Sequence, residues 1–186
     1  MSSAGAFFSR WRVRLSYPLA ILVLWFAHPT PRSILWAVPI GLLGLFLRAC
    51  AAGHLHKQEV LTVTGPYAYT RNPLYFGSAI LTLAAATATR SWISALILCA
   101  YFALFYSIVM RREEEELRRH HGGAFEEYAR AVPLFFPRLT PVRRSAASGG
   151  GVFSFAQYKK NHEYQAAIGF VLLLAVLLLI WWLRLR

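Results

Sequence analysis

Aspartate is missing from this sequence of 186 residues, so that all eight of its acidic residues are glutamates. The absence excludes a Walker B nucleotide site, an EF-hand calcium loop and an aspartic-protease dyad, because each of these depends on aspartate carboxylates. Polar chemistry in this chain must therefore come from glutamate, histidine, arginine and tyrosine.

Cysteines and metal-ligand clusters are also scarce. The only two cysteines, Cys50 and Cys99, lie in or beside apolar segments without Cys-x-x-Cys spacing, and we interpret both as unpaired packing residues. His54 and His56 could ligate a metal, but such a lone pair near a helix end is more often a polar contact at the membrane surface. We therefore predict no metal site.

Apolar residues make up 57% of the chain, which is too apolar for a soluble domain of this size and favours a membrane protein. The formal net charge of +12 would suit a nucleic-acid-binding protein. However, the 20 lysines and arginines gather beside apolar runs instead of following one polar stripe. This distribution is typical of anchors at a membrane edge, so we predict a membrane partner and no nucleic acid.

Five apolar segments are candidate membrane helices. A bilayer core of roughly 30 Å needs about 20 helical residues, and three segments reach or nearly reach that length. A fourth is about one turn shorter, and a fifth contains an arginine and a proline, so it either crosses or forms a tilted hairpin with the next helix. The three long segments are Ser33–Gly53, Ser91–Met110 and Ala166–Leu183, the shorter one is Pro73–Thr89, and the one with the arginine and the proline is Val13–Ala27. The predicted fold class is all-α, a polytopic membrane helix bundle of about five transmembrane helices.

The basic residues also predict a topology. Arg10, Arg12 and Arg14 place the N-terminus in the cytoplasm, and alternate crossings then place residues 54–72 and 111–165 on the same side. The first apolar run ends without a cleavage site, so we expect it to stay as a membrane helix. The basic C-terminal end would emerge on the opposite side, which leaves the direction of the last helix open.

Composition divides the chain into three parts. Residues 141–151 are rich in Pro, Ser and Gly, as in a flexible linker. We predict a membrane module over 1–140, a linker and juxtamembrane segment over 141–165, and a C-terminal transmembrane helix over 166–186.

Two polar segments could carry chemistry. Residues 65–77 read Gly-Pro-Tyr-Ala-Tyr-Thr-Arg-Asn-Pro-Leu-Tyr-Phe-Gly, a rigid turn into a helix start that suits either an interfacial aromatic belt or an anionic ligand group. Residues 111–117 read Arg-Arg-Glu-Glu-Glu-Glu-Leu, and four adjacent carboxylates on a helix point in different directions. They suit either a solvated helix extension or a site for an ammonium or ribose hydroxyl group.

A third stretch combines Phe-Glu-Glu-Tyr over 125–128 with Val-Pro-Leu-Phe-Phe-Pro-Arg over 132–138. In this order and spacing, the three motifs make the chain similar to the isoprenylcysteine carboxyl methyltransferases and the related phospholipid methyltransferases. The resemblance covers about Leu55 to Leu139. It implies a membrane-embedded S-adenosylmethionine site that is closed by the cytoplasmic C-terminal part of the module.

The resemblance also implies which positions contact the cofactor. They are the stretch before the Gly-Pro turn, the tyrosine after it, the segment around the second proline and the first glutamate of the acidic run. At these positions the chain carries Glu59, Val60, Leu61, Thr62, Tyr67, Asn72, Pro73, Leu74, Tyr75 and Glu113. No catalytic residue is predicted, because the sulfonium donor is already activated and the protein mainly orients the two reactants.

Two positions depart from the family pattern. Asn72 stands where the family usually has histidine, and an amide does not titrate near neutral pH, which argues against an essential acid–base role there. Val109 stands where the isoprenylcysteine branch has a substrate-binding arginine, which weakens the case for a prenylcysteine carboxylate. Arg111 and Arg112 are the nearest basic residues, and we predict that they bind the substrate.

The sequence thus predicts a multi-pass membrane enzyme that moves a methyl group from S-adenosylmethionine, bound on the cytoplasmic side, to a lipid-like or prenylated acceptor from the bilayer. Two alternatives stay open. One is an NADPH-dependent membrane reductase of the steroid-reductase type, which has a similar helical layout. The other is a non-enzymatic membrane protein whose acidic run only solubilises a helix end.

Overall fold

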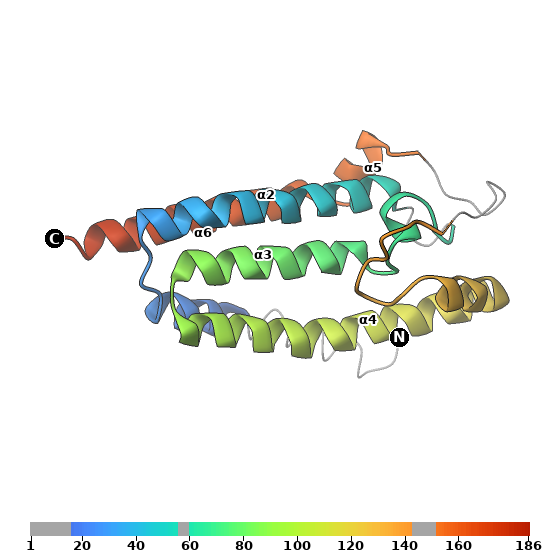
Figure 1. Ribbon diagram of the computed structural model, residues 1–186, viewed down its shortest axis with the longest axis horizontal. Coiled ribbons are helices and arrows are strands. Elements are labelled where there is room, and N and C mark those ends of the chain that lie inside the picture. The colour runs from blue at the N-terminus through green and yellow to red at the C-terminus, as the bar shows by residue number, and fades with distance from the viewer. Residues whose placement is uncertain (1–15, 56–59, 143–151) are drawn as a thin grey trace.

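The computed structural model describes residues 16–55, 60–142 and 152–186, and within them the only regular secondary structure is helical, with no strand. The predicted all-α fold class is therefore confirmed. Figure 1 shows the helices running along one common axis. The elements are the helix Ser16–Trp25, α2 Pro31–His54, the short 3-10 helix η1 Gly65–Ala68, α3 Pro73–Thr89, α4 Trp92–Ala131, α5 Phe155–Lys160 and α6 Tyr164–Leu183.

Three of these helices, α2, α4 and α6, are long and apolar enough to cross a membrane, whereas Ser16–Trp25 and α3 are apolar but shorter. The bounds of α3 agree with the predicted segment. The helix α4 is longer than the predicted span, because it continues past Met110 as far as Ala131. The arginines from which we predicted the orientation, at positions 10, 12 and 14, lie outside the described residues.

Capping residues fix where the long helices begin. The Thr30 hydroxyl accepts a hydrogen bond from the Ser33 N–H at 3.2 Å, and the Ser33 hydroxyl accepts one from the Thr30 N–H at 3.0 Å. This reciprocal capping pairs two N–H groups that the first turn of α2 would otherwise leave free. Pro31 and Pro73 open α2 and α3 at a position where proline loses no helical hydrogen bond.

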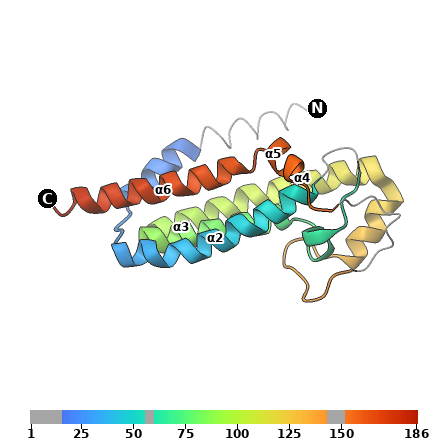
Figure 2. The same cartoon turned by 90° about the horizontal axis from the view of Figure 1, so that it is seen from above.

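Glycines allow α2 and α3 to pack side by side (Figure 1). A Cβ atom on Gly44 would lie 3.0 Å from the carbonyl oxygen of Gly77, and one on Gly77 would lie 2.9 Å from that of Gly44. Such small residues let helix backbones approach closely in a membrane bundle. On another side of α2 runs α6 (Figure 2), whose Phe170 ring occupies the space in which Gly41 would otherwise place a side chain.

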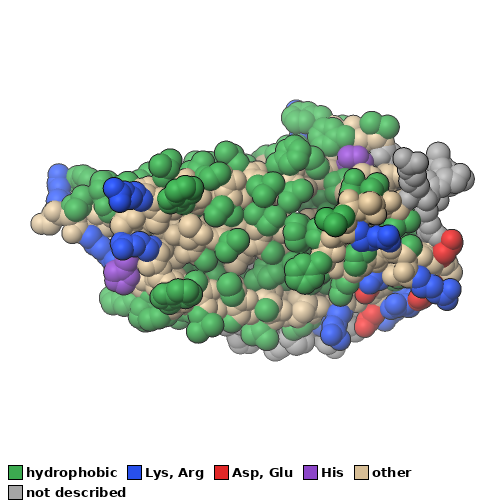
Figure 3. Space-filling view, in the orientation of Figure 1, with side chains coloured by type: hydrophobic (Ala, Val, Ile, Leu, Met, Phe, Trp, Pro, Cys, Tyr) green, Lys and Arg blue, Asp and Glu red, His purple; other side chains and the backbone are tan. Residues whose placement is uncertain are grey.

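Charge separates the two ends of the bundle from its middle. In Figure 3 hydrophobic side chains cover the middle, and the acidic side chains in view gather with basic ones at the end where α4 projects from the bundle. At the opposite end, basic side chains and a histidine appear without acidic ones. The candidate site lies at the end that carries both signs of charge.

Candidate functional site

A cavity of about 390 Å³ lies where α2 ends, α3 begins and α4 emerges from its apolar part. Its volume falls within the range of small-molecule sites, which is roughly 300–1,000 Å³. Nine of the ten residues predicted to contact the cofactor line it: Val60, Leu61, Thr62, Tyr67, Asn72, Pro73, Leu74, Tyr75 and Glu113. The tenth, Glu59, lies outside the described residues. Folding thus brings two polar segments, distant in sequence, to one cavity.

Seven further lining residues were not predicted. They are Leu55, Arg71, Glu116, Leu117, His120, His121 and Tyr128. Most of them come from the part of α4 beyond its apolar run. Their helical spacing could have identified them only with the knowledge that this face of α4 turns toward the loop before α3. The two residues predicted to bind substrate, Arg111 and Arg112, are not among the residues that line the cavity.

Glu113 is joined to the start of α3. The Tyr75 hydroxyl donates a hydrogen bond to its carboxylate, which bridges α3 and α4 at the cavity wall. The Tyr75 ring also packs edge-on against Tyr106 of α4, with ring centroids 5.3 Å apart. Glu113 is therefore held by a specific partner, and its carboxylate remains solvent-accessible at the cavity.

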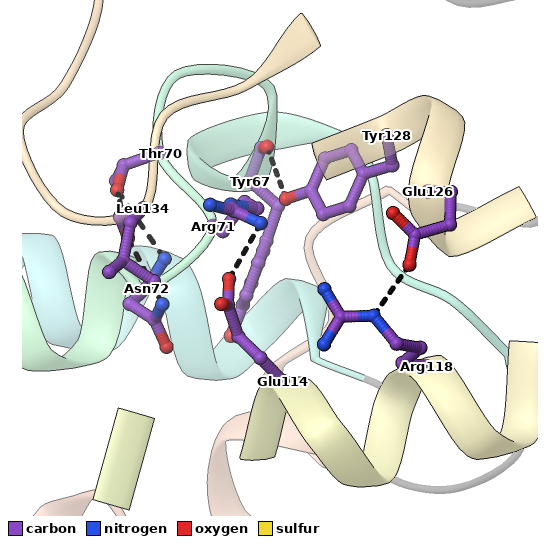
Figure 4. Close-up of polar contacts among 9 residues, drawn as sticks. All are labelled: Tyr67, Thr70, Arg71, Asn72, Glu114, Arg118, Glu126, Tyr128 and Leu134. Atoms are coloured by element: carbon purple, nitrogen blue, oxygen red, sulfur yellow. Dashed lines mark hydrogen bonds and ion pairs between the residues drawn. The ribbon is translucent and has the colours of Figure 1, made fainter. Parts of the chain in front are cut away.

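The next two glutamates have different surroundings, as expected for adjacent residues on one helix. Glu114 forms an ion pair with Arg71 at 2.7 Å, and both side chains are mostly buried (Figure 4). This pair ties the loop before α3 to α4. Glu115 is exposed and forms an ion pair with Arg119, the i,i+4 residue of the same helix, at 4.0 Å. Of these two glutamates, only Glu114 helps to build the site.

Hydrogen bonds to the segment after α4 fix the loop before α3. The Arg71 N–H donates to the Pro133 carbonyl at 2.9 Å. The Thr70 hydroxyl donates to the Phe135 carbonyl at 2.9 Å, and the Asn72 amide donates to the Leu134 carbonyl at 3.0 Å. Figure 4 shows Thr70 and Asn72 turned toward Leu134. Asn72 is buried, and its amide both holds the loop and lines the cavity.

A turn at Gly122 lets α4 fold back onto this loop. Gly122 has φ 48° and ψ −122°, a conformation that only glycine adopts readily, and it separates two helical stretches. The turned stretch buries Phe125 and Tyr128 against Val63. The Tyr128 hydroxyl donates to the Tyr67 carbonyl at 2.8 Å. The third sequence motif therefore packs on the loop that carries Tyr67 and covers this side of the cavity.

Tyr67 is one of the buried polar residues in the cavity wall. Its side chain is 7% exposed, and its hydroxyl makes no hydrogen bond to any described residue. Burial raises the pKa of the hydroxyl well above its usual value of 10.0, and the neighbouring Tyr128 and Glu113 raise it further. Figure 4 shows this side chain passing between the Arg71–Glu114 pair and Tyr128. The Tyr67 hydroxyl is thus a neutral hydrogen-bond donor in the cavity wall that makes no hydrogen bond to a described residue.

Comparison with known sequences places this chain in a family. Residues 20–124 match the family model described as phospholipid methyltransferase. The chain is also 34% identical over 155 residues to the cobalt-zinc-cadmium resistance protein CzcN of Cupriavidus metallidurans, which covers 78% of this chain and 70% of that protein. The chain belongs to the phospholipid methyltransferase family. Membership confirms the resemblance predicted from the motifs and implies methyltransferase activity in general.

A second relative is similarly close. The nickel-cobalt-cadmium resistance protein NccN of Alcaligenes xylosoxydans xylosoxydans is 34% identical over 140 residues, which are 72% of this chain and 65% of that protein. No solved structure matches the chain. Within the described residues, no group of three or more His, Cys, Asp or Glu is placed to hold a metal ion. The family match includes Glu113 and ends before Phe125, so the turned stretch of α4 and the C-terminal helices lie beyond it.

Proposed function

We propose that this integral membrane protein binds S-adenosylmethionine in the cavity at the end of the bundle and methylates a lipid-like acceptor that reaches it from the bilayer. One observation carries the proposal. The residues at the family's cofactor positions, apart from Glu59, come from four separate stretches of the chain and line a single cavity. A solvated helix end would give no reason for these residues to converge.

The cavity residues suit this cofactor chemically. Glu113 and Glu116 supply carboxylates for the ammonium group and for ribose hydroxyls, as charge-assisted hydrogen bonds are the stronger ones. The apolar side chains of Val60, Leu61 and Leu117 supply a surface for an adenine ring. The Tyr67 hydroxyl supplies a neutral donor that has no partner among the described residues. The negative and aromatic character of the wall also favours a cationic sulfonium.

The protein contributes mainly orientation and exclusion of water. When bound, S-adenosylmethionine supplies an electrophilic methyl group that an acceptor displaces in line. Holding two reactants in register can lower such a barrier by roughly 7–11 kcal/mol in favourable systems. The Tyr75–Glu113 bridge fixes the distance between α3 and α4 at the cavity, and Tyr128 holds the loop that carries Tyr67. We place the cavity on the cytoplasmic side, where the soluble cofactor is available.

The acceptor is proposed as an amphiphile without further assignment. A prenylcysteine carboxylate would need a positive partner, and Arg111 and Arg112 were predicted for that role from their position. Since neither lines the cavity, Arg71 is the arginine that is present in its wall. However, Arg71 is already paired with Glu114 at 2.7 Å. The charges of the cavity therefore favour an acceptor whose reacting group is not anionic.

Ligand-induced stabilisation tests this proposal directly. A ligand that binds only the folded protein raises its apparent melting temperature. We expect S-adenosylhomocysteine to raise the melting temperature of the detergent-solubilised protein in a saturable manner, and NADPH to have no effect. Stabilisation by NADPH alone would support the reductase alternative, and stabilisation by neither ligand would support a non-enzymatic membrane protein. Transfer of a labelled methyl group from S-adenosylmethionine to extracted lipids then identifies the acceptor.

A further inference from the structure

The C-terminal unit, residues 152–186, lies beyond the family match, yet it is docked onto α2 by several specific contacts. The Phe170 ring of α6 sits at Gly41 near the middle of α2, and the Phe153 ring sits at Gly53 near its end. The 153–163 part of this unit, predicted as a juxtamembrane segment, forms α5 and lies beside the end of α2 (Figures 1 and 2). Leu55, the residue directly after this end of α2, lines the cavity.

Asn161 caps the end of α2. The last carbonyls of a helix have no partner within the helix and require one from elsewhere. The Asn161 side-chain amide donates to the Ala52 carbonyl at 2.9 Å and to the Leu55 carbonyl at 3.1 Å. The Ser154 N–H donates to the Gly53 carbonyl at 2.9 Å. Since Leu55 is itself part of the cavity wall, the C-terminal unit holds one edge of the site directly.

A second connection passes through His54. Its ring packs edge-on against Phe153, with centroids 6.0 Å apart. On the other side the ring lies against Gly65, where a Cβ atom would be 2.6 Å from Nε2. Gly65 has φ +59° and opens η1, the turn that carries Tyr67. The C-terminal unit is therefore in contact, through one imidazole, with the turn that places the buried tyrosine.

A third connection reaches α3 through a buried ion pair. The Glu163 carboxylate, 8% exposed, accepts a hydrogen bond from the Arg48 guanidinium of α2. The same guanidinium donates to the Ser78 hydroxyl and, at 3.3 Å, to the Leu74 carbonyl. Leu74 lines the cavity. Charges inside a membrane bundle are costly unless they are paired, so Glu163 stabilises the orientation of Arg48 and thereby the start of α3.

We propose that the C-terminal unit positions the walls of the cofactor cavity, with Asn161 and Glu163 as its two positioning residues. Asn161 holds the wall that follows α2, and Glu163 holds, through Arg48, the wall at the start of α3. This inference rests on the proposed function for the identity of the ligand. The alternative is that the unit only adds stability to the bundle, in which case every docking contact acts alike.

Arg184 supplies a matched control, because it belongs to the same end of the chain and also donates to a backbone carbonyl. Its guanidinium donates to the Ala27 carbonyl at 2.6 Å, at the end of the bundle opposite the cavity. Asn161→Leu and Arg184→Gln thus remove comparable docking contacts at the two ends. A unit that only stabilises the bundle predicts lower melting temperatures and unchanged cofactor affinity for both variants.

A positioning role predicts a difference between them. We expect Asn161→Leu to weaken S-adenosylhomocysteine binding roughly tenfold, because the freed carbonyls let the wall shift, and to speed amide exchange over residues 60–67. Arg184→Gln should change neither quantity. The proposed function and the positioning role can fail separately. If the wild type does not bind S-adenosylhomocysteine, the proposed function is refuted. The difference in ligand-free hydrogen exchange between the two variants still tests the positioning role.

Glu163→Gln covers the case in which Asn161→Leu does not fold. The amide keeps the shape and one acceptor but removes the charge, so we expect weaker cofactor binding and faster exchange at residues 74–78, again with Arg184→Gln as the reference. Exchange and affinity equal to wild type in whichever of the two variants folds would overturn the inference. A loss shared equally with Arg184→Gln would overturn it as well.

Discussion

The two ends of the bundle are held together by different kinds of contact. At the end away from the cavity, the buried cluster consists of Ala27, Ile34, Ala37, Ala88 and Leu177, which are small or aliphatic. At the cavity end, the cluster contains Val63, Phe125, Tyr128 and Val132, and hydrogen bonds between loops surround it. The first end has an aliphatic core of closely packed helices with a few polar contacts such as Arg184 to the Ala27 carbonyl, whereas the second has aromatic residues and many polar contacts among loops and a turned helix.

The difference shows what a ligand site requires of a membrane bundle. Small side chains bring helix backbones together but leave no polar groups free, since the helices satisfy their own hydrogen bonds. A cavity with polar walls needs loops, whose backbone groups must then find partners elsewhere. Here the loop before α3 finds them in the segment after α4. Substitutions at the cavity end should therefore separate ligand binding from stability, which those at the other end should not.

The largest expected effect concerns Glu113, compared with Glu115 of the same acidic run. Glu113→Gln removes a carboxylate from the cavity wall, and the loss of a charge-assisted hydrogen bond should cost roughly 1.5–3 kcal/mol of cofactor binding, or about ten- to a hundredfold in affinity. Glu115→Gln changes an exposed carboxylate outside the cavity and should leave the affinity unchanged. Isothermal titration with S-adenosylhomocysteine measures both.

The structure makes Glu115 a better control than Glu116. From the sequence, Glu116 was as good a reference as any other glutamate of the run, but it lines the same cavity as Glu113. Equal affinities for Glu113→Gln and Glu115→Gln would remove the main support for the site at the level of single residues. Both variants should keep the melting temperature of the wild type within a few degrees, which excludes misfolding as the cause.

A second pair of variants tests whether the turned part of α4 is fixed by backbone conformation. Gly122→Ala places a side chain at φ 48° and ψ −122°, and this strain should cost about 1–3 kcal/mol of stability although the space around it is open. Gly123 has equally open surroundings without a positive φ. Gly123→Ala should be neutral or stabilise the protein by up to about 1 kcal/mol. Thermal unfolding of the two variants side by side decides; equal melting temperatures would mean that the turn is not strained.

Much of the fold could be predicted because the membrane imposes it. A stretch of about 20 apolar residues can satisfy its backbone in a bilayer only as a helix, so composition alone located α2, the first part of α4, and α6. The sequence suggested that the helix extends past Met110, but it could not tell a solvated extension from one whose glutamates build a site. Its helical geometry separates Glu113 and Glu114, which have partners on α3 and its preceding loop, from the exposed Glu115.

The candidate site could be predicted only where a motif marked it. Tyr67 and Glu113 lie within patterns shared with the family, and the structure places both at the cavity. By contrast, the contact of Tyr128 with the Tyr67 carbonyl depends on the turn at Gly122, although Tyr128 itself lies in the third motif, and the Arg48–Glu163 pair joins residues 115 positions apart. Neither contact has a local signature, because each depends on how distant helices pack.

The smallest expected effect concerns the Tyr67 hydroxyl, which makes no hydrogen bond to a described residue. Near neutral pH, Tyr67→Phe should change the free energy of unfolding of the ligand-free protein by no more than about 0.5 kcal/mol, since no hydrogen bond to a described residue is lost.

Above pH 10 the unfolding free energies of the wild type and Tyr67→Phe should diverge. Burial raises the pKa of Tyr67 in the folded state, so the unfolded chain releases this proton while the folded protein keeps it, and the stability of the wild type falls as the pH rises. The limiting slope is about 1.4 kcal/mol per pH unit from this one group, and Tyr67→Phe lacks it. Unfolding free energies at pH 9, 10 and 11 measure the difference, in which the other tyrosines cancel. Parallel curves would mean that the hydroxyl ionises as easily in the folded protein as in water, and the cavity would then be too wet at this point to hold a buried neutral donor.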